Sequence, residues 1–211
     1  MNAKVEQKER THETILASAA RLLRAKGISG ARVADVMQGA GLTVGGFYAH
    51  FASKEELIDE ALRRTSSELR QRLFAGVEGK AAGGVEVVLK RYLSAAHRDA
   101  QSMGCPFPAV VGEIGASGPA HRAALAEQVA EMIAGLEAML PANRAAARRV
   151  LALGLVALMY GGLSLARALQ GTALSDEFLR ACRTLGVAAA RGDFPCAEGV
   201  RANRKLHREG A

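Results

Sequence analysis

An all-helical fold is the architecture that this 211-residue sequence predicts, and three observations favour it. Alanine and leucine dominate the composition, and both are good helix formers. Extended runs of the β-branched and aromatic residues that suit strands are missing, and aromatic residues make up only 4% of the chain. Apolar residues recur every three or four positions, and glycine, proline and capping residues interrupt these runs. We therefore expect nine helices, with enough hydrophobic residues (49%) to bury a sizeable core.

Four of these helices are expected in the first 75 residues. Helical spacing predicts the first over 5–26, and Gly27 ends it. A short second helix follows after residue 32 and is broken at "GAGL". Thr43 is expected to cap a third helix that runs to about residue 51. Ser53 is expected to cap the fourth, because Glu56 stands three residues later, as a capping box requires.

A glycine-rich break over 76–84 is the best domain boundary along the chain, and five more helices are expected beyond it. Prolines mark the start of two of them, since proline suits the first turn of a helix. The expected helices are a fifth over 85–96, a sixth from Pro106, a seventh from Pro119 to Pro141, an eighth over about 142–170, and a ninth over about 175–191 capped by Ser175. The tail that follows has little apolar content and is expected to be disordered.

The charge balance of the chain is basic, with a formal net charge of +7 and a pI of about 9.7. Such a balance suggests a polyanionic partner, either nucleic acid or an anionic membrane surface. Between Arg21 and Lys54 there are five basic residues and one acidic residue, so positive charge is concentrated near the short N-terminal helices.

The cysteines and the termini point to a cytoplasmic protein. Three cysteines without C-x-x-C spacing argue against a disulfide framework or a zinc site, and no apolar leader opens the chain. The longest uncharged run, Val150–Ala166, has 17 residues, which is at the lower limit for a membrane span. A buried helix in a large interface is the favoured interpretation, and a membrane span is the alternative. We predict no membrane, no metal and no cofactor.

The stretch "GLTVGGFYAHF", residues 41–51, suggests contact with DNA. Two short helices joined by a glycine-containing turn, with a supporting helix before them, suit a helix-turn-helix whose second helix enters the major groove. Adjacent Gly45 and Gly46 give up helix stability, and we interpret them as allowing close approach to DNA. Phe47 and Phe51 are assigned to the small core that fixes the angle between the two helices.

Polar residues in and after this stretch suit contacts to phosphates. Thr43, Tyr48, His50 and Lys54 are the candidates, and such contacts position a protein without specifying sequence. The structural alternatives are a half-buried aromatic ring for Tyr48 and a solvated charge for Lys54. A glycine-rich cradle for a cofactor phosphate is disfavoured, because no strand precedes the glycines and no phosphate-loop motif occurs here.

At this point the sequence resembles the TetR family of transcriptional regulators. The resemblance covers about residues 11–60, through "VADVMQGAGLT", then "FYAHF" followed by "SKEEL". It implies a nine-helix, Ω-like homodimer. It also implies a helix-turn-helix domain over 1–52 and a ligand-binding and dimerisation domain over 53–191, with 192–211 as the tail.

The resemblance also assigns roles to single residues. Thr43, Tyr48 and Lys54 match the family's phosphate-contacting positions, and His50 matches a further backbone contact. Val44, Gly45 and Gly46 fall where base-reading residues usually lie, although many members have lysine at the position of Val44 and threonine or serine at that of Gly46. Three routes of base recognition stay open: Val44 against a thymine methyl, the glycine backbones, or Arg32 with Thr43.

An effector pocket among helices four to eight is a further implication of the resemblance. Such sites are mostly apolar with few polar groups, and so is an ordinary core. Glu113 either contacts the effector or forms a structural pair, and Cys105 is either a sensor of electrophiles or oxidants or a packed thiol. The candidate residues are Tyr92, His97, Cys105, Phe107, Val110, Glu113, Ile114, Met132, Met159 and Leu163.

The function expected from these features is that of a repressor that binds a pseudo-palindromic double-stranded DNA operator as a homodimer. A small, largely apolar effector of unknown identity would release it. The last two helices would form the dimer's four-helix bundle, where Gly154, Ala157, Gly161, Gly162 and Ala168 permit close approach. The alternatives are a helical small-molecule-binding protein or enzyme, and a nonspecific DNA-packing protein. No catalytic motif such as H-E-x-x-H or G-x-S-x-G occurs, so no enzyme is predicted.

Overall fold

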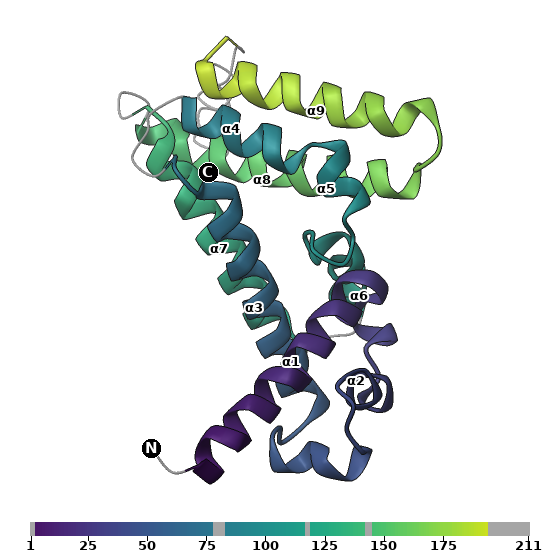
Figure 1. Ribbon diagram of the computed structural model, residues 1–211. Helices are drawn as coiled ribbons and strands as arrows, with labels where there is room; N and C mark the ends of the chain where they lie inside the picture. Colours follow the sequence, from purple (N-terminus) through teal and green to yellow (C-terminus); the bar gives the residue numbers. More distant parts are fainter. Residues whose placement is uncertain (1–2, 78–82, 117–118, 142–144, 194–211) are drawn as a thin grey trace, which may run out of the picture. The chain divides into compact units, whose positions relative to one another are not determined.

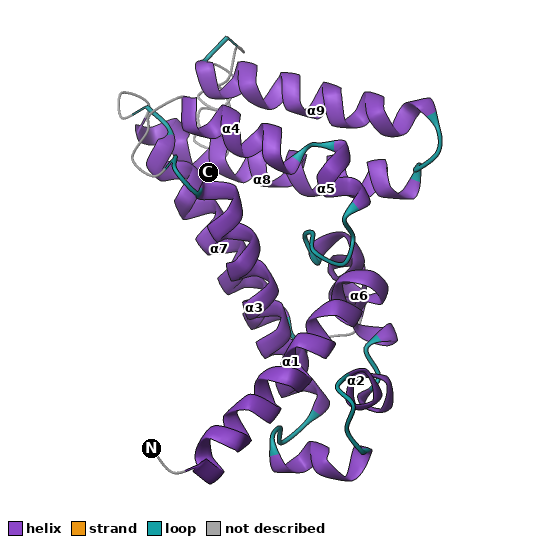
Figure 2. Cartoon of the chain, in the orientation of Figure 1, coloured by secondary structure: helices purple, strands orange, loops and turns teal. Residues whose placement is uncertain are grey.

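The structure is a computed structural model that describes residues 3–77, 83–116, 119–141 and 145–193 (Figure 1). Within these residues every regular element is helical, which confirms the predicted fold class (Figure 2). The elements are α1 Ala3–Gly30, α2 Val33–Gly39, the 3-10 helix η1 Val44–Ala49, α3 Lys54–Phe74, α4 Gly83–Tyr92, α5 Ala95–Asp99, α6 Phe107–Ala116, α7 Arg122–Met139, α8 Ala145–Ala168 and α9 Ala173–Arg191.

The expected and observed helices correspond closely in the described part of the chain. The third expected helix is the 3-10 helix η1, and the fifth is divided into α4 and α5, so nine expected helices become ten elements. The expected disordered tail lies, from residue 194 onward, outside the described residues.

The chain packs into two compact units. Residues 1–73 and 95–132 belong to the first, and residues 74–94 and 133–211 belong to the second, as far as they are described. This division follows backbone packing, whereas the functional boundary expected after residue 52 stays a prediction.

The first unit is built on α1, which packs against α2 and α6. Ile15, Ala19 and Leu23 lie on one side of α1 at helical spacing, and their side chains are fully buried. Val36 and Met37 of α2 are also fully buried, so the short helix is anchored through two adjacent apolar residues. Burial of about five such side chains stabilises this arrangement by about 1.5–3 kcal/mol for each of the larger ones.

Gly27 interrupts the helical geometry of α1, as the sequence predicts. Its φ of 69° and ψ of −167° lie in a region that is almost exclusive to glycine. The chain then turns on to Gly30 before α2 begins. The break redirects the chain at the end of α1.

Ser53 caps the start of α3, as predicted, because the backbone N–H of Glu56 donates to Ser53 Oγ at 3.1 Å. The carboxylate of Glu56 accepts from the N–H of Ala52 at 2.5 Å, one residue before the position that a capping box uses. Further along α3, Glu68 accepts a hydrogen bond at 2.6 Å from the buried guanidinium of Arg24 in α1. These contacts fix α3 to α1 within the first unit.

The second unit contains α4, α8 and α9, and α8 lies side by side with α9 in Figure 1. Gly162 faces this packing, since a Cβ there would lie 2.8 Å from Cys182 Sγ. Gly162 therefore permits close approach between α8 and α9 within one chain, and the expected dimer bundle stays a prediction. The expected cap at Ser175 is wrong: α9 begins at Ala173 after Thr172, and the buried Ser175 hydroxyl donates to the carbonyl of Ala166 at 2.6 Å.

One helical segment in the described residues, Ala147–Ala168 of α8, is long and apolar enough to cross a membrane by length and composition alone. Core helices of folded domains pass the same test, and α8 packs against α4 and α9.

Candidate nucleic-acid interface

The segment over 41–51 forms a short 3-10 helix whose inner side is locked by two phenylalanines. Phe47 and Phe51 are each 1% exposed, and their rings stack with centroids 5.8 Å apart. Their assignment to a small core is confirmed. Thr43 occupies the position before η1 with an extended backbone, but its hydroxyl makes no capping hydrogen bond. The expectation that this hydroxyl caps the helix is therefore wrong.

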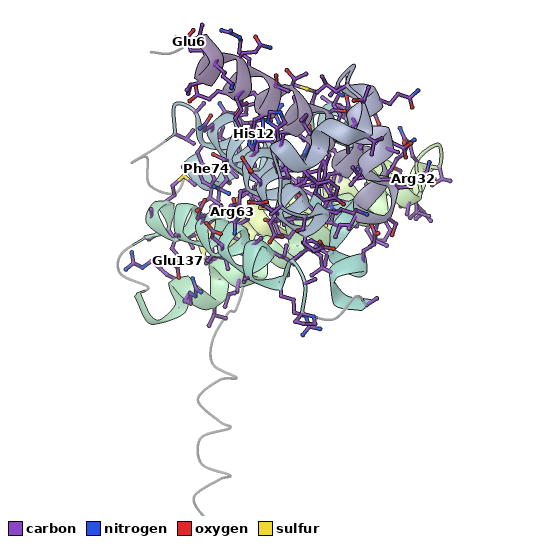
Figure 3. All side chains as sticks on the ribbon, turned by 90° about the horizontal axis from the view of Figure 1, so that it is seen from below. Glu6, His12, Arg32, Arg63, Phe74 and Glu137 are labelled. Atoms are coloured by element: carbon purple, nitrogen blue, oxygen red, sulfur yellow. The ribbon has the colours of Figure 1, made fainter. Side chains whose placement is uncertain are left out.

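His12 of α1 holds the end of this segment against the rest of the unit (Figure 3). Its ring stacks on Phe51 with centroids 4.4 Å apart, and its Nε2 lies 2.8 Å from Oε1 of Glu60 in α3. One imidazole thus joins three elements. The contact between His12 and Glu60 could not be predicted from the sequence, because 48 residues separate them and no local pattern links them.

The outer side of η1 faces away from the protein. Val44 is 50% exposed and Tyr48 is 76% exposed. A Cβ added at Gly45 would meet no atom within 4 Å, and one added at Gly46 would meet only Met37 Cε, at an ordinary 3.8 Å. The fold itself therefore does not require glycine for space at either position.

The basic residues around this segment already have partners within the protein. Lys54 Nζ donates to the carbonyl of Ile28 at 3.1 Å, and Arg21 donates to the carbonyl of Gly39 at 3.2 Å. Arg32 Nε donates to Asp35 Oδ2 at 2.7 Å, although its side chain is 73% exposed and labelled in Figure 3. The hydrogen bond from Arg32 lowers the pKa of Asp35, so the pair is ionised at neutral pH.

Comparison with known proteins matches this same region. Residues 15–61 fit the family described as "Bacterial regulatory proteins, tetR family". The HTH-type transcriptional repressor KstR2 of Mycobacterium tuberculosis is 45% identical over 49 residues, which are 23% of this chain and 24% of that protein. The N-terminal region of the chain is therefore similar to the TetR family.

Likeness to solved TetR regulators extends over most of the chain and concerns the fold. A regulator from Chloroflexus aurantiacus is 24% identical with a TM-score of 0.72, covering 87% of this chain and 95% of that one. A regulator from Cytophaga hutchinsonii is 22% identical with a TM-score of 0.71, covering 87% and 96%. The reduced form of NemR from E. coli is 22% identical with a TM-score of 0.71, covering 84% and 95%.

His50 directly follows η1, and its pKa is shifted. Burial lowers the pKa of His50, and electrostatic interactions with His12 and Lys8 lower it further. The ring is therefore neutral at neutral pH. Its Nδ1 is buried and has no hydrogen-bond partner among the described residues. A phosphate contact through this residue would come from a neutral donor rather than from a charge.

Glu113 of α6 forms a structural pair with the end of α1. Its carboxylate accepts hydrogen bonds from the N–H of Ile28 at 2.9 Å, the N–H of Ser29 at 2.8 Å, and the Ser29 hydroxyl. Burial acts to raise the pKa of Glu113, but the donors on Ser29 and Ile28, with the charge of Lys54, outweigh it and lower the pKa. A Cβ at Gly27 would lie 1.8 Å from Glu113 Oε1, so the missing side chain lets the carboxylate reach these N–H groups.

The remaining predicted effector residues divide between the two units. Tyr92, Met159 and Leu163 are buried in the second unit. In the first unit the Cys105 N–H donates to His97 Nε2 at 2.9 Å, and the thiol is buried. The other four, which are buried in the first unit, are Phe107, Val110, Ile114 and Met132. Effector contact by any of these residues stays a prediction.

A hollow of about 490 Å³ lies along the first turns of α1. It is lined by Lys4, Val5, Lys8, Glu9, His12 and Glu13, none of which is among the predicted effector residues.

Proposed function

We propose that this chain is a cytoplasmic transcriptional repressor that binds a pseudo-palindromic double-stranded DNA operator as a homodimer. The observation that carries the proposal is η1, a short helix held from within by Phe47 and Phe51 and open on its outer side. A short element with an exposed outward face suits entry into a major groove about 12 Å wide.

Phosphate contacts are assigned to the polar residues that flank this face. The Thr43 hydroxyl makes no capping bond, so it can donate to a phosphate oxygen, and the exposed Tyr48 hydroxyl can do the same. Lys54 uses one donor for the Ile28 carbonyl, and an ammonium group has two more. His50 contributes as a neutral donor.

We place the homodimer interface on an exposed face of α8 and α9. Gly154 and Gly161 have no atom within 4 Å of a Cβ position, so a second backbone can approach them closely. Exposed apolar residues surround them at helical spacing, and such a face favours burial against a second copy. They are Val150, Leu153 and Leu165 on α8, with Leu174 and Leu185 on α9. A two-fold pair of η1 helices would meet half-sites about 34–36 Å apart.

We propose that a small, largely apolar effector releases the protein from DNA by acting on α6. Phe107, Val110 and Ile114 of this helix are buried, while Glu113 of the same helix holds the end of α1. An effector that displaces α6 would therefore disturb the support of the DNA-binding helices. Coupling of this kind is typically about 1–3 kcal/mol, and a near-complete switch needs about 5.5 kcal/mol of differential binding.

Fluorescence anisotropy on the DNA upstream of the gene tests the proposal. We expect saturable binding at nanomolar to micromolar protein, with affinity that falls steeply as salt is raised, because phosphate contacts release counterions. Random DNA of the same length and base composition is the control, and it should bind at least a thousandfold more weakly. Equal affinity for both DNAs would contradict the proposal and favour nonspecific packing.

A further inference from the structure

The exposed side of η1 lacks the side chains that usually read bases by hydrogen bonding. Residues 41–51 contain no arginine, lysine, asparagine, glutamine, aspartate or glutamate. Of their hydrogen-bonding side chains, only those of Thr43 and Tyr48 are exposed, since His50 is partly buried. The bidentate pairs that distinguish guanine or adenine cannot form from this segment.

Arg32 is the alternative reader that the sequence suggested, and it is already engaged. Its Nε and Nη2 donate to the two carboxylate oxygens of Asp35 at 2.7 and 3.3 Å. A bidentate contact to guanine would need the same fork of donors. It would also leave the Asp35 carboxylate without its partner beside a polyanion.

The remaining surface of η1 is apolar, which restricts what it can recognise. In the major groove the C5-methyl of thymine is the apolar group that a base pair presents. Val44, the first residue of η1, is half exposed, and the two residues that follow it have no side chains. A β-branched side chain is stiff about χ1, so little conformational entropy is lost when it docks.

We propose that Val44 reads the C5-methyl of a thymine in each operator half-site, with Gly45 and Gly46 allowing the approach. This inference rests on the proposed function and names the specificity-determining contact of its binding site. Tyr48 is less suited to this role, because its ring packs edge-on against the buried Phe47 with centroids 5.2 Å apart.

The test removes single methyl groups from the DNA. Footprinting of the wild-type protein on its upstream DNA first locates the half-sites, and each thymine is then replaced by deoxyuridine, which differs only in lacking the methyl. We expect one position per half-site at which affinity falls about fourfold, and about fifteenfold when both half-sites are changed. Replacing that thymine–adenine pair by 5-methylcytosine–guanine should bind more tightly than cytosine–guanine, since the methyl is restored.

Protein variants connect the effect to one side chain. Val44→Ser removes both methyl groups and leaves a small polar side chain, so it should bind thymine and deoxyuridine with affinities within about twofold of each other. Val111→Ser is the matched control, because Val111 is 44% exposed on α6, and it should keep the full discrimination.

Three results would overturn the inference while leaving the proposed function in place. The first is a wild-type affinity that deoxyuridine leaves unchanged at every thymine. The second is half-sites that contain no thymine, and the third is a Val44→Ser variant with undiminished discrimination. Failure of the wild-type protein to bind its upstream DNA is a different outcome, and it would overturn the proposed function together with this inference.

Discussion

Replacing Gly45 or Gly46 by alanine should preserve the stability of the fold but weaken DNA binding. A Cβ at Gly45 meets no atom within 4 Å, and one at Gly46 meets Met37 Cε at 3.8 Å. Neither substitution therefore creates a clash. Replacing glycine by alanine at a compatible helical site stabilises a protein by about 0.4–1 kcal/mol, because the unfolded chain has fewer states. For a chain of this size that raises the melting temperature by about 1–4 °C.

The same methyl groups should weaken DNA binding, because they keep η1 away from the base edges. Loss of the contact to one base pair costs about 1–3 kcal/mol, which is about 5- to 150-fold in affinity. Thermal unfolding followed by circular dichroism and anisotropy titration on the upstream DNA measure the two effects. Gly112→Ala is the control, since Gly112 of α6 is also open, and it should leave affinity unchanged. Wild-type affinity in both η1 variants, at unchanged or higher stability, would refute the inference that these glycines face DNA.

Four further variants test other parts of the structure. Gly27→Ala should lower the free energy of unfolding by about 2–5 kcal/mol in urea titrations, because its backbone conformation is restricted to glycine and its Cβ would displace Glu113. The folded pKa of Glu113 is below its ordinary 4.5, so its stabilisation is complete above pH 4.5 and is lost as the pH falls through the lower folded value. Glu113→Gln should therefore flatten the acid side of the stability curve measured by denaturant titration, and an unchanged curve would contradict this role. Gly161→Glu should sediment as a monomer while Gly112→Glu stays dimeric, because a carboxylate would be buried in the proposed interface. Tyr48→Phe should keep the melting temperature but weaken DNA binding at least tenfold, and equal affinity would exclude a phosphate contact through its hydroxyl.

Local signals in the sequence predicted much of the fold, and their physics explains why. The break at Gly27 and the cap at Ser53 are indicated by residues within four positions of one another. Phe47 and Phe51 are both buried, as their spacing suggests, although only Phe47 lies within η1. Such features need no knowledge of the rest of the chain.

Contacts between residues that lie far apart in the chain could not be predicted from local sequence patterns. Glu113 meets residues 84 and 85 positions away, and a single carboxylate on an otherwise apolar helix could not distinguish that pairing from effector contact. Ser175 has the composition of a cap, but its hydroxyl is buried against Ala166, nine residues earlier.

The uncharged face over residues 41–51 has a consequence for the effect of salt. On the proposed function, ions compete with the flanking contacts to the backbone of the duplex, but they have little to screen where neutral groups meet the bases. A rise in salt would then lower the association constant for every operator sequence by a similar factor and leave the ranking of those sequences intact. Ionic strength would set how much protein is bound, and nucleotide sequence would set which operator is released first.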